Sequence, residues 1–399
     1  MIRRIQIDNF KSLDGFSLPP VGTQPLANFT CLIGANGSGK TSVLQVLDFL
    51  CYFMRGDIRA WLKDRGWEDD RLSSSFDSSP VDLFKASILI QLDPSTQAEW
   101  SVHYNLYTSE CYEEKIVING DTFLEVKDGD VTILEGNGPP RIFTELSLRG
   151  SALEALQVGP APNPLRVIKE LFSNNIATFE LFSPHAVKRH SPHSKNMGKR
   201  GENLAGFAAD LGTAIQRRIS DRMREFYPSI QNVQVADDRE LKSFFLFESE
   251  NFLREVVYSP HFSDGFTRIL AIVTQVESSN VSNRVLLLDE VEDGIHPEVM
   301  AKLIDYLVNS NTQVIATTHS PLILNYLTDD QARKSVLFLY RNWEGRSRSC
   351  RYFDLPSAKS KLGILGPGEV YVDTSIEQLI REAEEMERGA SAQAGAVAQ

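Results

Sequence analysis

One short segment near the N-terminus constrains this chain more than any other feature. Gly34–Thr41 reads GANGSGKT and satisfies the pattern G-x-x-x-x-G-K-[ST]. An apolar run, residues 29–33, precedes the segment, and apolar residues at helical spacing follow it as far as Met54. A buried strand, a glycine loop and a helix in this order are the context that a phosphate-binding loop requires. The alternative is a glycine-rich turn before an ordinary helix.

The residues of this loop have separate expected roles. Backbone N–H groups of the small residues would turn toward phosphate groups, and the following helix would present its positive dipole end to the same anion. We expect Lys40 to contact the β- and γ-phosphates of ATP and Thr41 to hold Mg²⁺. The residues expected to bind the nucleotide in this loop are Asn36, Gly37, Ser38, Gly39, Lys40, Thr41 and Ser42.

A second apolar run, Val285–Leu288, ends in two carboxylates, Asp289 and Glu290. Ligands of parallel α/β sheets bind at the carboxyl ends of the strands, so both side chains are expected at that edge. Asp289 would support Mg²⁺, and Glu290 would orient or polarise an attacking water. A buried strand followed by an acidic turn is the alternative interpretation.

Two further segments carry candidate residues. Residues 314–316 form an apolar run that leads to His319, which would then face the γ-phosphate. A structural or surface role is the alternative for this histidine. Residues 263–268 read SDGFTR and precede a predicted apolar helix, so Ser263 or Asp264 could also act as its N-cap.

The order of these segments resembles the Walker A, signature, Walker B and switch-histidine order of ABC-type ATPases, with the signature in its SDG form. Asn9–Ser12 reads NFKS and resembles the start of RecF and SMC-like heads. Glu292–Pro297 resembles the E-x-G-x-H-P D-loop of their prokaryotic relatives, including OLD-family nucleases. The resemblance covers residues 1–55 and 200–340.

The resemblance implies ATP hydrolysis with Glu290, His319 and Lys40 as catalytic residues. In ABC ATPases the signature of one subunit closes over the nucleotide of the other, so Ser263 and Gly265 would contact the γ-phosphate in trans. That implies a homodimer or a higher homo-oligomer. By the same resemblance the ATPase would control DNA, a nuclease or another separately encoded effector in bacterial defence or DNA repair. No Asp-x-Asp pair follows His319, so a C-terminal Toprim nuclease domain is not expected.

The expected fold is α/β, an ABC ATPase head in which a P-loop sheet with helices is joined by an antiparallel β subdomain. Residues 1–55 and 200–345 would form the ATPase core, split in sequence. Residues 56–199 would be a mixed α/β insertion with a β meander over 85–136, and no heptads predict a long coiled coil. Residues 346–399 would hold a strand, an acidic helix and a disordered tail. Apolar spacing predicts one helix over 204–227.

Charge and hydropathy limit the partners. A net charge of −12 would repel nucleic acid at long range, so any DNA contact would need a local basic patch. The candidate residues for such a patch are Lys188, Arg189, Lys199 and Arg200, with the arginines of the next helix beyond them. Ordinary solvated loop charges are the alternative. No apolar stretch could span a membrane and no signal peptide is evident, so a cytoplasmic protein without membrane contact is expected.

Two rival functions share these motifs. A nucleotide-binding subunit of a transporter has all four, but its Walker A and signature normally lie closer in sequence than Lys40 and Ser263 do here, and it lacks an NFKS start. A scaffold that binds ATP to hold an oligomer, with slow turnover, is the other alternative. Metal other than Mg²⁺ is not expected, since the four cysteines form no CxxC pair.

Overall fold

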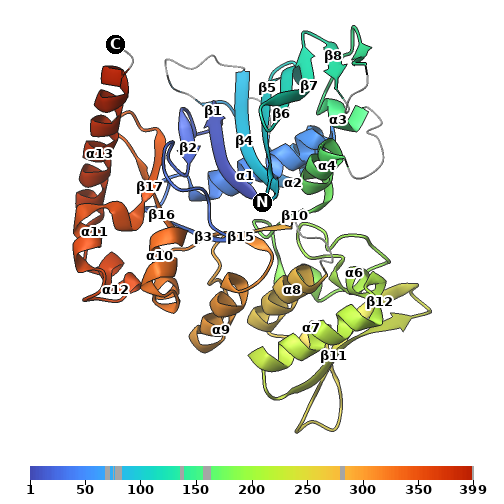
Figure 1. Cartoon of the computed structure of the whole chain (residues 1–399). Coiled ribbons are helices and arrows are strands. Elements are labelled where there is room, and N and C mark those ends of the chain that lie inside the picture. Colours follow the sequence, from blue (N-terminus) through green and yellow to red (C-terminus); the bar gives the residue numbers. More distant parts are fainter. Residues whose placement is uncertain are drawn as a thin grey trace. The chain divides into compact units, whose positions relative to one another are not determined.

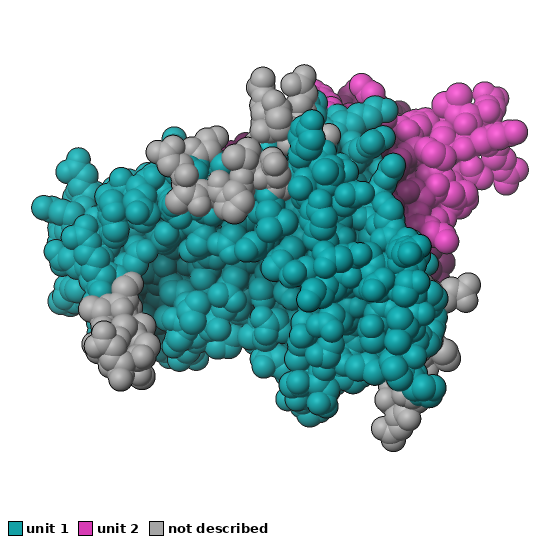
Figure 2. All heavy atoms as spheres, turned by 90° about the horizontal axis from the view of Figure 1, so that it is seen from above, with its two compact units in different colours: residues 1–176, 315–399 teal, residues 177–314 magenta. Residues whose placement is uncertain are grey.

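The computed structural model describes residues 1–67, 72–74, 76, 83–134, 139–155, 163–278 and 284–397, with side chains described as far as residue 389. The chain divides into two compact units. The first unit is Met1–Ile176 with Ile315–Gln399, and the second is Ala177–Val314. Figure 1 labels the helices and strands, and Figure 2 colours the first unit teal and the second magenta.

Within the described residues, the first unit contains an eight-stranded antiparallel sheet in the order β2-β1-β4-β5-β6-β7-β8-β9 (Figure 1). The meander predicted over 85–136 is therefore confirmed. Asn119-Gly120 and Asp128-Gly129 have positive φ at both positions, which lets the chain turn tightly between neighbouring strands. The strands are β1 Ile2–Asp8, β2 Phe16–Leu18, β4 Leu83–Asp93, β5 Thr96–Asn105, β6 Glu110–Ile118, β7 Asp121–Lys127, β8 Asp130–Ile133 and β9 Arg141–Phe143.

Strand β3, Phe29–Ile33, belongs to a different sheet of the first unit. It pairs in parallel with β16, Val336–Arg341, which pairs in turn with antiparallel β17, Ser347–Arg351. The end of β15, Gln313–Thr317, lies on the other side of β3. Every residue of β3 is buried, as expected for a strand covered on both faces. The helices of this unit are α1 Lys40–Met54, α2 Ile58–Arg65, α3 Ala152–Ala155, α4 Pro164–Asn174, α10 Asp329–Ser335, α11 Pro356–Lys361, α12 Pro367–Val372 and α13 Ile376–Val397.

The phenylalanine of the NFKS segment is a core residue. Phe10 is fully buried, and its ring centroid lies 5.8 Å from that of Phe49, 5.9 Å from that of Phe84 and 6.3 Å from that of Trp61. Aromatic pairs at these separations add stability beyond the apolar area that they bury. Phe10 thereby joins the end of β1 to α1, α2 and β4.

The second unit has its own three-stranded antiparallel sheet, formed by β11 Ile230–Asp238, β12 Ser243–Glu250 and β13 Val257–Tyr258. Helix α6, Leu204–Asp210, packs on β12, and α7, Thr213–Phe226, packs on β11. The other elements here are β10 Ile176–Thr178, which begins at the last residue of the first unit, α5 Pro184–Val187, α8 Asp264–Glu277, β14 Val285–Leu288 and α9 Pro297–Val308.

The prediction of one helix over 204–227 is wrong, because α6 ends at Asp210 and α7 begins at Thr213. Leu211 has φ −75° and ψ 132°, and Gly212 has φ −58° and ψ 154°, so the chain is extended between the two helices. Glycine weakens a helix, and its flexibility suits this break. Apolar spacing on both sides of the break gave the appearance of one continuous helix.

The compact units divide the chain at other places than the expected domains. Strand β4 pairs with β1 along Ile2–Asp8 and so belongs to the N-terminal sheet. One unit boundary falls at 176/177 and the other at 314/315.

Helix α13 runs from Ile376 to Val397 and includes most of the segment expected to be a disordered tail. The segment is rich in alanine, which has the highest helix propensity.

Candidate nucleotide-binding site

The glycine loop after β3 has a backbone that only glycine fits. Gly34, Gly37 and Gly39 have φ of 142°, 74° and 104°. A Cβ atom at Gly34 would lie 2.1 Å from the carbonyl oxygen of Leu339, and one at Gly39 would lie 2.4 Å from Oγ of Ser347. The loop is thus packed against β16 and β17, and the glycines are needed both for φ and for space.

Lys40 is the first residue of α1 and is only 4% exposed. Its Nζ donates to the carbonyl oxygens of Gly34, at 2.9 Å, and Ala35, at 3.1 Å, so the ammonium group curls back over the loop. No side chain caps the N-terminus of α1. The first-turn N–H groups and the lysine charge therefore form the cradle that a phosphate group fits.

Residues outside the motif stabilise the loop through hydrogen bonds to its backbone carbonyl groups. The hydroxyl of Ser347 lies 2.8 Å from the carbonyl oxygen of Ser38 and 2.7 Å from the hydroxyl of Ser12. Nε of Arg341 donates to the carbonyl oxygen of Gly37 at 2.7 Å. Ser347 and Arg341 lie more than 300 positions after the loop, and no local pattern marks them.

His319 follows β15 at the same edge of the first unit's sheet. The N–H of Thr318 donates to the carbonyl oxygen of Leu32 at 3.2 Å, which places the start of the His319 segment beside the end of β3. His319 is exposed. Lys40 and His319 therefore lie at the ends of neighbouring strands within one unit.

In the second unit, Asp289 and Glu290 directly follow β14, whose residues are all buried. Glu290 is exposed and has φ of 46°, a left-handed conformation that is uncommon for a residue with a side chain. The turn that follows is closed by the N–H of Asp293, which donates to the carbonyl oxygen of Glu290 at 2.9 Å. Strained backbone of this kind is concentrated at functional sites.

The SDG segment forms the N-terminus of α8 in the same unit. Ser263 is exposed, and its Oγ accepts a hydrogen bond from the N–H of Phe266 at 3.2 Å, so the N-cap interpretation is confirmed. Gly265 is buried, and a Cβ there would lie 2.4 Å from the carbonyl oxygen of Gly294. The start of α8 therefore packs directly on the turn after Glu290.

The four candidate DNA-contacting residues are differently placed. Nζ of Lys188 lies 2.8 Å from Oδ1 of Asp264, so this cation is paired beside the start of α8. Arg189 and Arg200 are exposed, and Lys199 is half-buried. Within the described residues, no group of three or more histidine, cysteine or acidic side chains is placed to hold a metal ion.

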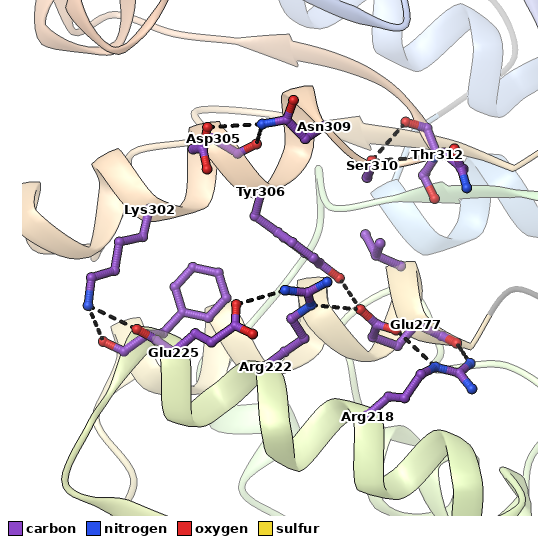
Figure 3. A pocket seen from close by; sticks show the side chains of 13 residues that line it. Arg218, Arg222, Glu225, Glu277, Lys302, Asp305, Tyr306, Asn309, Ser310 and Thr312 are labelled. Atoms are coloured by element: carbon purple, nitrogen blue, oxygen red, sulfur yellow. Dashed lines mark hydrogen bonds and ion pairs between the residues drawn. The ribbon is translucent and has the colours of Figure 1, made fainter.

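Three arginines of α7 form ion pairs with carboxylates, which compensate their positive charge. Figure 3 shows Arg218 and Arg222 turned toward Glu277 at the end of α8, with N–O distances of 3.1 and 3.3 Å. Arg222 also pairs with Glu225 at 2.7 Å, and Arg224 pairs with Asp221 at 2.8 Å. The ion pairs of Arg218 and Arg222 line one side of a cleft of about 520 Å³ and compensate its charge.

Two family models match the chain. An AAA ATPase domain matches residues 1–119, and a model described as "AAA domain, putative AbiEii toxin, Type IV TA system" matches residues 141–325. OLD nuclease of Thermus scotoductus is 25% identical over 37% of this chain. Structural maintenance of chromosomes protein 1 of Saccharomyces cerevisiae is 29% identical over 36% of it. The matches span only 24% and 14% of those two proteins.

Solved structures with a similar fold are Smc heads. One, bound to the C-winged helix domain of ScpA, aligns with 87% of this chain and 96% of its own at a TM-score of 0.56 and 14% identity. A second, derived from Pyrococcus furiosus and bound to the C-terminal domain of ScpA, aligns with 87% of this chain and 95% of its own at 0.54 and 12%. Among the described helices, none is both long and apolar enough to cross a bilayer.

Proposed function

We propose that this chain, an ABC-type ATPase of the RecF/SMC-like and OLD-related branch, binds ATP with Mg²⁺ and hydrolyses it. The observation that carries the proposal is the loop around Lys40. Its three glycines with positive φ, its tight packing on β16 and β17, and the uncapped start of α1 leave a cradle shaped for phosphate.

Each candidate residue has its own role in this proposal. Lys40 neutralises the β- and γ-phosphates, and the hydroxyl of Thr41 offers an oxygen ligand to Mg²⁺. Asp289 supports Mg²⁺, and Glu290 accepts a proton from the attacking water or orients it. Mg²⁺, when bound, withdraws charge from the phosphate oxygens. His319 would hydrogen-bond the γ-phosphate.

The nucleotide also joins two copies of the chain. Ser263 is exposed at the N-terminus of α8, a 14-residue helix, where a helix dipole and a hydroxyl favour an anion. We infer that this turn meets the γ-phosphate held by a second copy, which makes a head-to-tail dimer with two equivalent sites. Gly265 acts through its close packing on Gly294 and keeps the turn in place.

The dimer cycle would control a partner in the cytoplasm. One similar protein is named a nuclease, one family model is described as a putative toxin, and two similar Smc heads were solved with a domain of ScpA bound. These descriptions support a separately encoded effector protein in bacterial defence or DNA repair. DNA contact through Arg189, Lys199 and Arg200 is part of the proposal, with Lys188 contributing less because Asp264 pairs with it.

The direct test is ATP turnover by the purified chain with Mg²⁺. Wild type should release phosphate, and Lys40→Ala should abolish release because the cradle loses its buried cation. Lys115→Ala is the matched control, since Lys115 is a half-buried lysine that pairs across the meander with Glu125. Turnover by wild type that did not exceed that of Lys40→Ala would refute the proposal.

A further inference from the structure

A buried arginine joins the start of α8 to the turn after β14. Arg268 is 5% exposed and lies on the second turn of α8. Its Nη2 donates to the carbonyl oxygens of both Asp289, at 2.7 Å, and Glu290, at 2.9 Å. Its Nη1 lies 3.6 Å from Oδ2 of Asp293. One guanidinium therefore contacts the turn at three residues, Asp289, Glu290 and Asp293.

Burying the Arg268 guanidinium at this turn carries a cost in free energy. Burial lowers the pKa of the Arg268 guanidinium, and nearby carboxylates, first that of Asp293, act against this effect. Nε of Arg268 is buried without a hydrogen-bond partner among the described residues. A buried cation with one unsatisfied N–H costs more free energy than an uncharged contact that would fix the same turn. A functional demand on the position of the turn would account for it.

The backbone conformation of Glu290 gives a reason for fixing the turn. Its φ of 46° is disfavoured for a residue with a Cβ, so the backbone needs external contacts to stay there. The two carbonyl groups that Arg268 holds flank the Cα atom of Glu290, so these hydrogen bonds restrain the backbone that carries its side chain. A second contact, between Gly265 and Gly294, ties the same helix to the same turn one residue after Asp293.

We propose that Arg268 is a positioning residue that sets the Glu290 carboxylate and makes the Ser263 turn and the Glu290 turn move as one rigid piece. The inference rests on the proposed hydrolytic role of Glu290. It goes further, because Ser263 would meet the nucleotide of the second copy while Glu290 serves the nucleotide of its own copy. Nucleotide in one pocket would then adjust the catalytic carboxylate of the other.

Arg284 offers a matched control for this residue. Arg284 is a half-buried arginine of the second unit, and burial lowers its pKa. Its Nη1 donates to the carbonyl oxygen of Gln275 and to the hydroxyl of Ser278 at the other end of α8. Replacing either arginine with glutamine removes a desolvated cation and its hydrogen bonds, but only Arg268→Gln frees the turn at Glu290.

Steady-state kinetics separate positioning from general stability. Arg268→Gln should lower kcat on the order of 100-fold, the cost of a misplaced catalytic group, and leave the KM for ATP nearly unchanged. Arg284→Gln should keep the wild-type kcat. Combined with Glu290→Gln, Arg268→Gln should cause no additional loss, because the group that it positions is already gone. Equal kcat in Arg268→Gln and Arg284→Gln, or a fully additive double variant, would overturn the inference.

Hydrogen exchange tests the same claim without ATP turnover, so it also decides the matter if the proposed ATPase activity fails. The N–H groups of Asp293 and Ile295 close the turn on Glu290 and Glu292. Arg268→Gln should remove their protection, while Arg284→Gln should not. If Arg268→Gln proves too unstable to purify, Arg268→Lys keeps the charge but loses the fork that spans both carbonyls, and should lose the same protection in part. Full protection in the folded Arg268 variants would refute the rigid connection.

Discussion

The hydroxyl groups of Ser12 and Ser347, 335 positions apart in the chain, lie 2.7 Å from each other beneath the glycine loop. Ser347 is fully buried, and its hydroxyl also lies 2.8 Å from the carbonyl oxygen of Ser38. Because a carbonyl can only accept, Ser347 donates to Ser38 and accepts from Ser12. The last serine of the NFKS segment thereby supports the loop through a strand near the other end of the chain.

Replacement of Ser347 by alanine should weaken ATP binding. The Ser38 carbonyl and the Ser12 hydroxyl would lose their buried partner. This loss costs about 1 kcal/mol and would hold the loop less firmly in its conformation. Isothermal titration with ATP and Mg²⁺ measures the change in Kd. Ser349→Ala is the control, since Ser349 lies on the same strand and bonds the carbonyl oxygen of Ser17, away from the loop. Equal Kd values for the two variants would contradict this role of Ser347.

Gly265→Ala should disrupt the start of α8 although alanine favours helices. The added Cβ would lie 2.4 Å from the carbonyl oxygen of Gly294, and rigid backbone must move to relieve the contact. Overpacking of this kind costs about 1–3 kcal/mol, and the shifted turn should lower kcat for ATP by at least about tenfold.

Gly212→Ala is the matched control for that variant. Gly212 lies in the same unit with φ of −58° and no atom within 4 Å of an added Cβ, so its thermal midpoint and kcat should stay near those of wild type. Equal thermal midpoints and kcat values for the two glycine variants would show that the Gly265–Gly294 contact is unimportant.

Glu248 should make the stability of the second unit depend on pH. It is 7% exposed, its Oε2 has no hydrogen-bond partner among the described residues, and burial raises its pKa from 4.5 to about 7. A pKa raised on folding means that protonation favours the folded state. The stabilising contribution is therefore complete below about pH 4.5 and is lost as the pH rises through about 7.

Thermal unfolding at pH 6 and pH 8 checks this assignment. Wild type should lose a few degrees between the two values, and Glu248→Gln, which stays neutral, should lose less. Glu255→Gln removes a carboxylate from an exposed site of the same unit and should keep the wild-type difference. A Glu248→Gln variant with the wild-type pH dependence would rule out Glu248 as the source.

The sequence was sufficient for elements with strong local signals. The strand, loop and helix around Lys40 and the meander over 85–136 both follow from periodicity and turn residues. The cap formed by Ser263 is equally local. Such features depend on residues within a few positions of one another, which is why one sequence predicts them.

What the sequence could not supply depends on contacts between distant segments. Ser347 and Arg341 support the glycine loop from strands more than 300 positions away, and Arg268 reaches the turn 21 positions after it. The arginine of SDGFTR was visible, but nothing local indicates that its guanidinium would be buried against two carbonyl groups. The ion pairs of Arg218 and Arg222 were missed for the same reason, since Glu277 lies on another helix.

The central claim is that ATP held by the loop around Lys40 joins two copies of the chain through Ser263. Multi-angle light scattering of Glu290→Gln, which should bind ATP without hydrolysing it, tests this directly. With Mg²⁺ and ATP the measured mass should be twice that of the 44.7 kDa chain, and it should return to the monomer value when Lys40→Ala is added. A mass that stays at the value of one chain with and without ATP, at micromolar concentrations, would contradict the account.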